Sequence, residues 1–256
     1  RKTYYKIAPG CVDLKKTVEQ RVVNFAVAHY AFNFDMLFYD VTTLYFETFE
    51  EDDLRKNGFS KDNKSQQPQI LIALIVSKEG FPVAYEVFSG NTFEGHTIIS
   101  VMKACIGRSG VKDLTVVADA AMISTENVQQ LTQNNINYIV GARLGNIPSE
   151  VLETIDKNIS REDGKSIRIK TGNGYLVCSY SSIRYRKDKY EMEKQIEKAK
   201  QVIAKPSKSK KVKFTQTKDQ GIELNEALIE KTQKLLGIKG YYTNLDTSVA
   251  DDKTII

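Results

Sequence analysis

The stretch "LFYDVTTLYF", residues 37–46, combines strand-forming side chains with one carboxylate, Asp40, near its centre. Val, Thr, Tyr and Phe favour strands, and both alternating faces of this stretch are mostly apolar. Such a pattern predicts a strand inside a sheet that is covered on both sides. A buried anion there needs a hydrogen-bond donor, a cation or a metal ion. Two simpler alternatives stay open, namely an acid capped by the neighbouring Thr hydroxyls and an acid exposed at the end of the strand.

Four more strand-like runs follow in the chain, and helical patterns separate the last three of them. A short turn joins the second run to the third, so the first three strands predict an antiparallel meander. Ser124 can cap the helix that precedes the last run. The predicted order is therefore βββαβαβ, with strands at residues 37–46, 69–77, 81–88, 114–118 and 137–143.

A second acid, Asp119, directly follows the fourth strand-like run. A helical crossover from the third strand to the fourth should be right-handed and should keep both in one sheet. A fourth strand beside the first would place Asp119 near Asp40. Two adjacent carboxylates in a partly dry sheet repel each other unless a divalent cation lies between them. A metal-binding pair therefore explains Asp40 better than a single capped acid does.

The composition limits the class of protein. With 256 residues, 41% hydrophobic and 27% charged, the chain can bury a full core and looks globular and soluble. No apolar run approaches the roughly 20 residues that span a bilayer. The sequence shows no signal peptide, and it does not begin with Met, so we expect it to be a piece of a longer protein.

Cysteine and histidine usage bears on redox chemistry and on metals. Cys11, Cys105 and Cys178 are scattered and odd in number, which argues against a disulfide framework and favours a reducing cytoplasm. The two histidines, His29 and His96, are far apart, so a zinc site is not expected. Any metal would be held by oxygen ligands, which indicates magnesium or manganese.

Positive charge is concentrated in one segment. Residues 184–213 contain 12 Lys and Arg against 4 Asp and Glu, a balance of +8, so the rest of the chain carries 5 − 8 = −3. This asymmetry is typical of a surface that meets a polyanion. A solvated lysine-rich helix and loop is the alternative.

The regions outside the predicted sheet have their own patterns. Residues 12–29 predict an amphipathic helix, with an apolar stripe formed by Leu14, Val18, Val22 and Phe25. Beyond Arg143 the chain predicts a hairpin, a charged helix over 187–204, a second helix over 221–237 and a strand over 239–245. We therefore expect four parts: an N-terminal helical segment (1–33), a core (34–145), an inserted basic α+β subdomain (146–236), and a return strand with the start of a final helix (237–256).

Several segments carry a resemblance to a known family. "FYDVTTLYFE", "VAYEVFSGN", "VVADAAMIS" and "GYYTNL" occur in an order similar to that of the DDE transposases of bacterial insertion sequences. The likeness is to the group with an insertion between the second and third acids, and "YSSIRYRKDKYEMEKQIEKA" resembles the basic helical part of that insertion. The resemblance covers the chain from about residue 34 onward. It implies an α/β, ribonuclease H-like fold: a mixed five-stranded sheet flanked by helices, with an inserted α+β subdomain.

The resemblance also implies a chemistry. Asp40 and Asp119 would be the first two catalytic acids and would hold two Mg²⁺ or Mn²⁺ ions for DNA cleavage and strand transfer. The third acid should be a Glu in a Tyr-x-x-Arg-x-x-x-Glu pattern after "GYYTNL", and this pattern does not occur. The glutamates Glu223, Glu226 and Glu230 precede that strand. We therefore expect a fragment that stops short of the third acid and is inactive alone.

The remaining expectations concern partners and site lining. Double-stranded DNA, comprising element ends and target, would be bound by two copies of the protein in the bacterial cytoplasm, associated with the nucleoid. Its contacts would be Arg184, Arg186, Lys187, Lys189, Lys208, Lys210 and Lys211. Thr42, Asn91 and His96 would line the active site. Two other classes stay open: a non-catalytic DNA-binding transposase remnant, and a phosphohydrolase with Asp40 as nucleophile.

Overall fold

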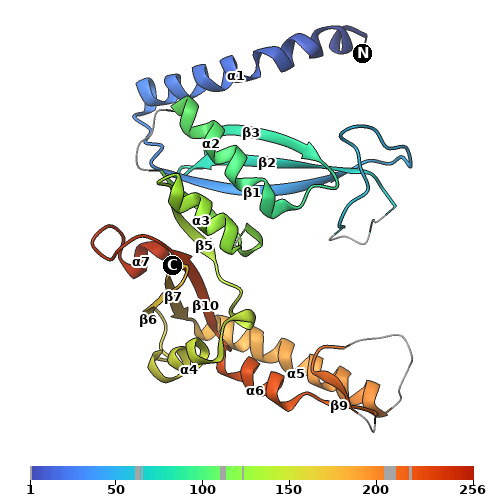
Figure 1. Ribbon diagram of the computed structural model, residues 1–256, viewed down its shortest axis with the longest axis vertical. Coiled ribbons are helices and arrows are strands. Elements are labelled where there is room, and N and C mark those ends of the chain that lie inside the picture. Colours follow the sequence, from blue (N-terminus) through green and yellow to red (C-terminus); the bar gives the residue numbers. More distant parts are fainter. Residues whose placement is uncertain are drawn as a thin grey trace. The chain divides into compact units, whose positions relative to one another are not determined.

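The computed structural model describes residues 2–60, 64, 66–109, 114–122, 124–204, 212–218 and 221–256. The chain divides into two compact units, residues 1–141 and 142–256 (Figure 1). None of the helices that the structure describes is long and apolar enough to cross a membrane. Unit 1 contains α1 (Lys2–Tyr30), β1 (Met36–Tyr45), β2 (Gln69–Ser77), β3 (Pro82–Ser89), η1 (Glu94–His96), α2 (Ile98–Ser109), β4 (Thr115–Ala118), η2 (Ala120–Met122), α3 (Thr125–Gln133) and β5 (Asn137–Gly141).

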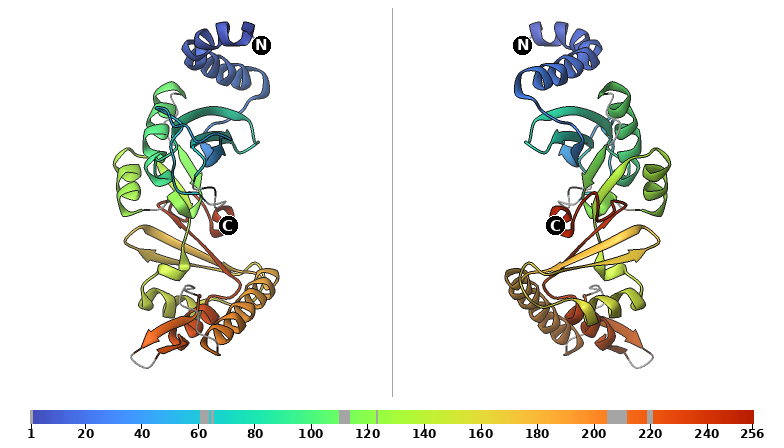
Figure 2. Two further views of the ribbon diagram at one scale, coloured as in Figure 1. Left: turned by 90° about the vertical axis from the view of Figure 1, so that its right-hand side faces the viewer. Right: turned by 90° about the vertical axis from the view of Figure 1, so that its left-hand side faces the viewer.

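The strands of unit 1 form a mixed sheet in the order β3-β2-β1-β4-β5. The pairs β1–β2 and β2–β3 are antiparallel, whereas β1–β4 and β4–β5 are parallel. The predicted meander, the order βββαβαβ and the place of the fourth strand beside the first are all confirmed. These five strands have the arrangement that the resemblance to a ribonuclease H-like fold implies. Figure 2 shows α2 (green) and α3 (yellow-green) on the same side of these strands.

The two faces of β1 differ in burial. Leu37, Tyr39 and Val41 are buried, whereas Phe38 and Asp40 on the opposite face are exposed. The expectation of a strand covered on both sides is therefore wrong for this structure. Within the described part of unit 1, α2 and α3 lie on the same side of the strands (Figure 2), and the apolar content of β1 could not indicate this. Within the described residues, no hydrogen bond joins Asp40 to a threonine hydroxyl, so the capped-acid alternative is not supported.

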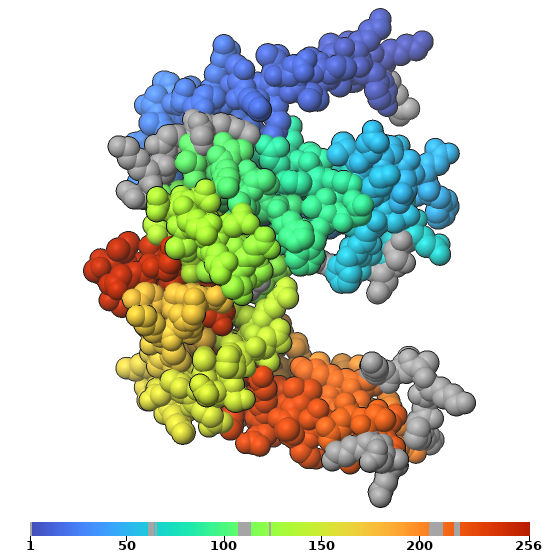
Figure 3. Space-filling view, viewed as in Figure 1, coloured from blue at the N-terminus to red at the C-terminus, as the bar shows by residue number. Residues whose placement is uncertain are grey.

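The helix α1 contacts the rest of unit 1 through a different face from the predicted one. The apolar stripe formed by Leu14, Val18, Val22 and Phe25 is exposed. The buried positions are Val23 and Ala26, and Lys15 Nζ lies 2.9 Å from a carboxylate oxygen of Glu86 in β3. Figure 3 shows the first half of α1 (dark blue) projecting with its side chains exposed. Glu19 of α1 also accepts a hydrogen bond from the Tyr85 amide of β3, an edge strand, at 3.3 Å.

Unit 2 has the predicted α+β character. It contains η3 (Leu144–Asn146), α4 (Ser149–Asn158), β6 (Ser166–Thr171), β7 (Gly174–Tyr180), α5 (Ser182–Ala204), β8 (Thr215–Lys218), β9 (Gly221–Leu224), α6 (Glu226–Lys234), β10 (Ile238–Thr243) and α7 (Asp252–Ile255). The predicted hairpin is the antiparallel pair β6–β7, and β10 pairs with β7, also antiparallel. The division of this region into parts 146–236 and 237–256 stays a prediction.

Two expectations for unit 2 are corrected. The helix predicted over 221–237 begins as a strand, because β9 pairs with β8 and α6 starts only at Glu226. Gly221 has a φ of +128°, and Asn225 caps the helix by accepting a hydrogen bond from the Leu228 amide at 3.0 Å. The helix α4 was not predicted, although Leu152 and Ile155 are buried at helical spacing.

Candidate active site

Asp40 and Asp119 reach the same edge of a parallel strand pair. The register of β1 and β4 pairs Tyr39 with Ala118, so the next residue on each strand is one of the two acids. Both side chains line one hollow of about 240 Å³ and both residues are exposed. The expected convergence of the two acids on adjacent strands is therefore present in the structure.

The floor of this hollow is apolar. It is formed by Phe38, Leu74, Val76 and Val117, from the three neighbouring strands β1, β2 and β4. Such a floor keeps water from one side of the carboxylates and so strengthens their attraction for a cation. The hollow is open to solvent on the other side, where a large substrate can approach.

The donor set suits a hard divalent cation. Carboxylate oxygens are the ligands that Mg²⁺ prefers, and Mg²⁺ is commonly held by one or two carboxylates, with water and substrate phosphates completing its coordination. Among the described residues there is no group of three or more His, Cys, Asp or Glu side chains placed to hold a metal ion. The pair of acids fits the expected Mg²⁺ or Mn²⁺ as a partial shell of two carboxylates.

The turn after β4 fixes Asp119. Its Oδ1 accepts a hydrogen bond from the Ala120 amide at 2.5 Å, and its carbonyl accepts one from the Met122 amide at 3.0 Å. Gly141 in β5 permits this turn to approach, because a Cβ at that position would lie 3.1 Å from the Ala120 nitrogen. The backbone therefore holds the carboxylate of Asp119 at the strand end.

A buried hydroxyl pair supports the other acid. The Tyr39 hydroxyl lies 2.5 Å from the Thr97 hydroxyl, which donates a hydrogen bond to the Glu94 carbonyl at 2.6 Å. Burial raises the pKa of Tyr39 to about 12, so this hydroxyl stays protonated at neutral pH. Sequence reasoning missed Thr97, since a lone Thr before a helix carries no signal for such a contact.

The three residues predicted to line the site do not border the hollow. Thr42 lies two residues beyond Asp40 on the exposed face of β1. Asn91 follows β3 and accepts a hydrogen bond from the Ser89 hydroxyl at 2.8 Å. His96 is exposed in η1 and packs edge-to-face on Phe93, with ring centroids 5.2 Å apart. Their participation at a larger substrate interface stays a prediction.

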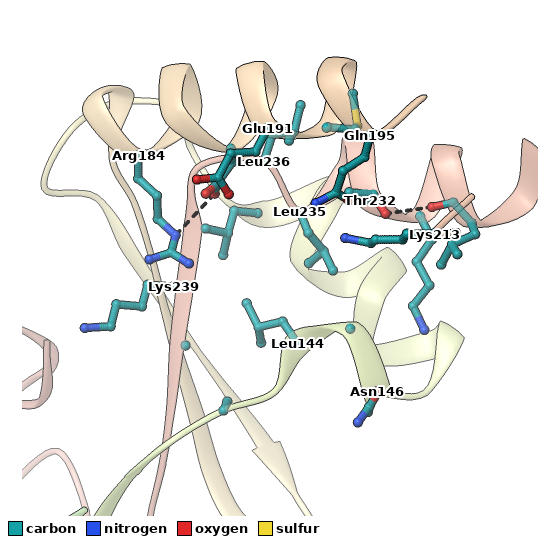
Figure 4. Close-up of a pocket in the computed structure, with 18 residues that line it drawn as sticks. Leu144, Asn146, Arg184, Glu191, Gln195, Lys213, Thr232, Leu235, Leu236 and Lys239 are labelled. Carbon is teal, nitrogen blue, oxygen red and sulfur yellow. Dashed lines mark hydrogen bonds and ion pairs between the residues drawn. The ribbon is translucent and has the colours of Figure 1, made fainter. Parts of the chain in front are cut away.

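A second cavity lies in unit 2. It has a volume of about 490 Å³ and is bounded by α5, α6, β10 and the segment 142–146 (Figure 4). Its cationic lining consists of Arg184, Lys213, Lys231 and Lys239. Arg184 is paired with Asp188 of the same helix at 3.3 Å, and Figure 4 draws this contact as a dashed line. The cavity has a size typical of ligand pockets and a net positive wall.

The basic residues predicted to bind DNA divide into two groups. Arg184, Arg186, Lys187 and Lys189 lie in the first turns of α5 and are exposed. Lys208, Lys210 and Lys211 lie outside the described residues. The first group forms an exposed cationic surface at the N-terminal end of α5. Arg184 also lines the cavity of about 490 Å³, and Lys189 lines another cavity of about 720 Å³.

Comparisons with known proteins add the following. The piggyBac transposase synaptic complex with hairpin DNA matches with 15% identity and a TM-score of 0.41, over 67% of this chain and 38% of that one. The Mos1 transposase paired-end complex with left transposon end matches with 9% identity and a TM-score of 0.30, over 49% of this chain and 41% of that one. A pre-cleavage Mos1 transpososome matches with 9% identity and a TM-score of 0.29, over 47% of this chain and 41% of that one.

This chain therefore spans about two fifths of the length of those structures. A comparison with curated protein sequences found no match. The sequence model of the family described as "Transposase DDE domain" matches residues 35–243, which include both acids, all of the unit 1 sheet and most of unit 2. The chain belongs to the family of transposase DDE domains.

Proposed function

We propose that this chain carries the catalytic core of a DDE transposase, which performs metal-dependent DNA cleavage and strand transfer. The observation that supports this most is the pairing of Asp40 and Asp119 at one hollow, from strands far apart in the sequence. Family membership supports the same class of reaction. The proposed substrate is double-stranded DNA, bound at paired ends by two copies of the chain.

Each acid has a defined task in this proposal. Asp40, near the middle of β1, offers its carboxylate on the open face of the sheet, and Asp119 offers its own at the end of β4. Both carboxylates would hold divalent metal, which would supply activation of a water or a 3′ hydroxyl as nucleophile and stabilisation of the leaving oxygen. The apolar floor closes one side of the hollow, so the scissile phosphate would approach the two carboxylates from the open face of the sheet.

A pair of conservative substitutions tests the assignment. Asp40→Asn and Asp119→Asn remove one negative charge each and should abolish DNA cleavage without unfolding the protein. Cleavage is measured on labelled DNA carrying element ends, with a protein that includes all of the transposase. Asp53→Asn, in an exposed loop, is the matched control and should leave cleavage unchanged. Wild-type cleavage rates in either site variant would reject the assignment.

The third carboxylate remains unassigned within this sequence. Glu223 lies in β9, whereas Glu226 and Glu230 lie in α6, so all three belong to unit 2 and precede β10. We propose that none of them completes the site. Reading the codons that follow Ile256 tests this directly: a Tyr-x-x-Arg-x-x-x-Glu pattern supports the enzyme. A stop codon there supports the second candidate, a transposase remnant that binds DNA without cleaving it.

A further inference from the structure

We infer that Asn127 is a positioning residue for the catalytic acids, although it touches neither of them. Its side-chain amide joins the turn after Asp119 to the turn of η1, which in turn contacts the strand of Asp40. This inference rests on the proposed role of Asp40 and Asp119 and adds to it the element that sets their separation.

The first part of the connection is the amide itself. Asn127 Nδ2 donates to the carbonyl of Gly95 at 2.6 Å and to the carbonyl of Met122 at 2.8 Å. The residue is only 6% exposed, so both bonds are shielded from water. An amide NH₂ has two N–H donors, and here each one serves a different turn. A side chain without donors would leave two buried carbonyls to find new partners.

The second part leads from Met122 to Asp119. The Met122 amide donates to the Asp119 carbonyl at 3.0 Å, which closes the one-turn helix η2. Asp119 begins this turn and Met122 ends it. Asn127 therefore holds the end of the turn that begins with the Asp119 carboxylate. Loss of this bond would free η2 to shift, and the carboxylate would shift with it.

The third part leads from Gly95 to Asp40. Gly95 lies in η1, whose first carbonyl, that of Glu94, accepts a hydrogen bond from the Thr97 hydroxyl. Thr97 is fully buried and contacts the Tyr39 hydroxyl, next to Asp40 in β1. A Cβ at Gly95 would lie 2.7 Å from the Phe93 ring and 3.5 Å from the Ala121 carbonyl, so the two turns pack closely. Hydrogen bonds and backbone links therefore connect Asp119 to Asp40 through Met122, Asn127, η1, Thr97 and Tyr39.

The consequence concerns metal affinity more than DNA binding. Residues that orient metal ligands through hydrogen bonds typically change affinity by about 10- to 100-fold when they are replaced. Asn127→Ala removes both donors, and Asn127→Asp replaces them with a carboxylate facing two carbonyl oxygens. Both variants should loosen the spacing of the two acids while leaving their charge in place.

The test measures Mn²⁺ binding to the full chain by titration calorimetry, at a temperature at which every variant is folded by circular dichroism. Ser124→Ala is the matched control, because Ser124 caps the same helix by accepting from the Asn127 amide at 3.1 Å. It weakens α3 without breaking either bond of the Asn127 side chain. We expect Asn127→Ala to bind Mn²⁺ at least 10-fold more weakly than the wild type and Ser124→Ala to bind it as the wild type does.

Equal Mn²⁺ affinity in Asn127→Ala and the wild type would overturn the inference, and so would an equal loss in Ser124→Ala. If Asn127→Ala does not fold, Thr97→Val is measured against the same criterion, because it breaks the connection at the Tyr39 hydroxyl. Asp40→Asn separates this inference from the proposed function. Unchanged Mn²⁺ binding in Asp40→Asn would reject the acid pair itself, whatever Asn127 does.

Discussion

At the scale of single residues, Asp40 combines a backbone fixed in a strand with a side chain that is exposed to solvent. Its strand neighbours Tyr39 and Val41 are buried, and its own carboxylate faces solvent above an apolar floor. A charge in this position costs little desolvation when the protein folds, yet it lies where a cation can be partly dehydrated. The residue is thus available for binding without a large penalty to stability.

The three cysteines give a prediction at the same scale. Cys11 is exposed, whereas Cys105 and Cys178 are buried, and burial raises the pKa of Cys178 to about 12. At pH 8, well below that pKa, Cys178 stays a thiol. The thiolate is the reactive form, so Cys178 should react slowly. Ellman's reagent at pH 8 should therefore find one fast-reacting thiol per native chain.

Two controls define this experiment. Cys11→Ser should remove the fast phase, and unfolding in guanidinium should expose the remaining thiols of the wild type. Two or three fast thiols in the native wild-type chain would contradict the burial of Cys105 and Cys178.

At the scale of elements, the α5 helix depends on a cap supplied from another segment. Asp163 accepts hydrogen bonds from the Ser182 amide at 2.5 Å and from the Ser182 hydroxyl at 2.6 Å. These bonds, the hydroxyl first and the amide second, hold the pKa of Asp163 below its usual 3.8. A carboxylate at a helix N-terminus also compensates the helix dipole.

The lowered pKa of Asp163 gives a prediction about acid stability. A carboxyl whose pKa is lower in the folded state stabilises that state above its unfolded pKa, and the effect is lost as pH falls through the folded pKa. Asp163→Asn should therefore lower the Tm of the chain at pH 7, and the difference from wild type should shrink below pH 3.8. Differential scanning calorimetry across this range measures it, with the exposed Asp53→Asn as control. A Tm difference that stays constant to pH 2.5 would contradict the capping role.

The elements also show which patterns in a sequence predict structure. The five strands of unit 1 were predictable because each is a β-branched or aromatic run bounded by turn residues. The strand β9 was not, because "GIEL" is short and is followed by an amphipathic helix whose pattern masks it. The open face of β1 was also not predictable, since an apolar strand does not reveal how many helices are available to cover it.

The same limit applies to the candidate site. The pairing of Asp40 with Asp119 could be anticipated from topology, because a crossover keeps β4 in the same sheet and a place beside β1 brings the two acids together. The resemblance to DDE transposases implies the same pair. Thr97 and Asn127 could not be found in this way. Their roles depend on side-chain hydrogen bonds across loops, and neither residue type has a characteristic spacing for such contacts.

At the scale of the whole molecule, charge and chemistry occupy different units. The two acids belong to unit 1, and the cationic residues of α5 belong to unit 2. Contacts between cations and phosphates supply affinity but read no base sequence. We propose that unit 1 carries the cutting function and that the cationic surface of α5 in unit 2 holds DNA.

Neutralising the first turns of α5 tests this separation. Replacing Arg184, Arg186, Lys187 and Lys189 with Gln should weaken DNA binding, because each lost phosphate contact reduces the slope of log K against log salt by about 0.9. Fluorescence anisotropy at several salt concentrations measures both quantities. Lys165→Gln and Lys170→Gln, at exposed positions in unit 2, form the control. An unchanged slope in the α5 variant would show that this surface is only solvated.

The most direct measurement of the central claim is a double-mutant cycle on Mn²⁺ binding. Calorimetry compares the wild type with Asp40→Asn, Asp119→Asn and the double variant, all as the full chain. If the two carboxylates form one metal centre, each single substitution abolishes Mn²⁺ binding as completely as the double substitution does. Small and additive losses from the two single substitutions would mean that the acids bind independently, and the shared catalytic centre would be contradicted.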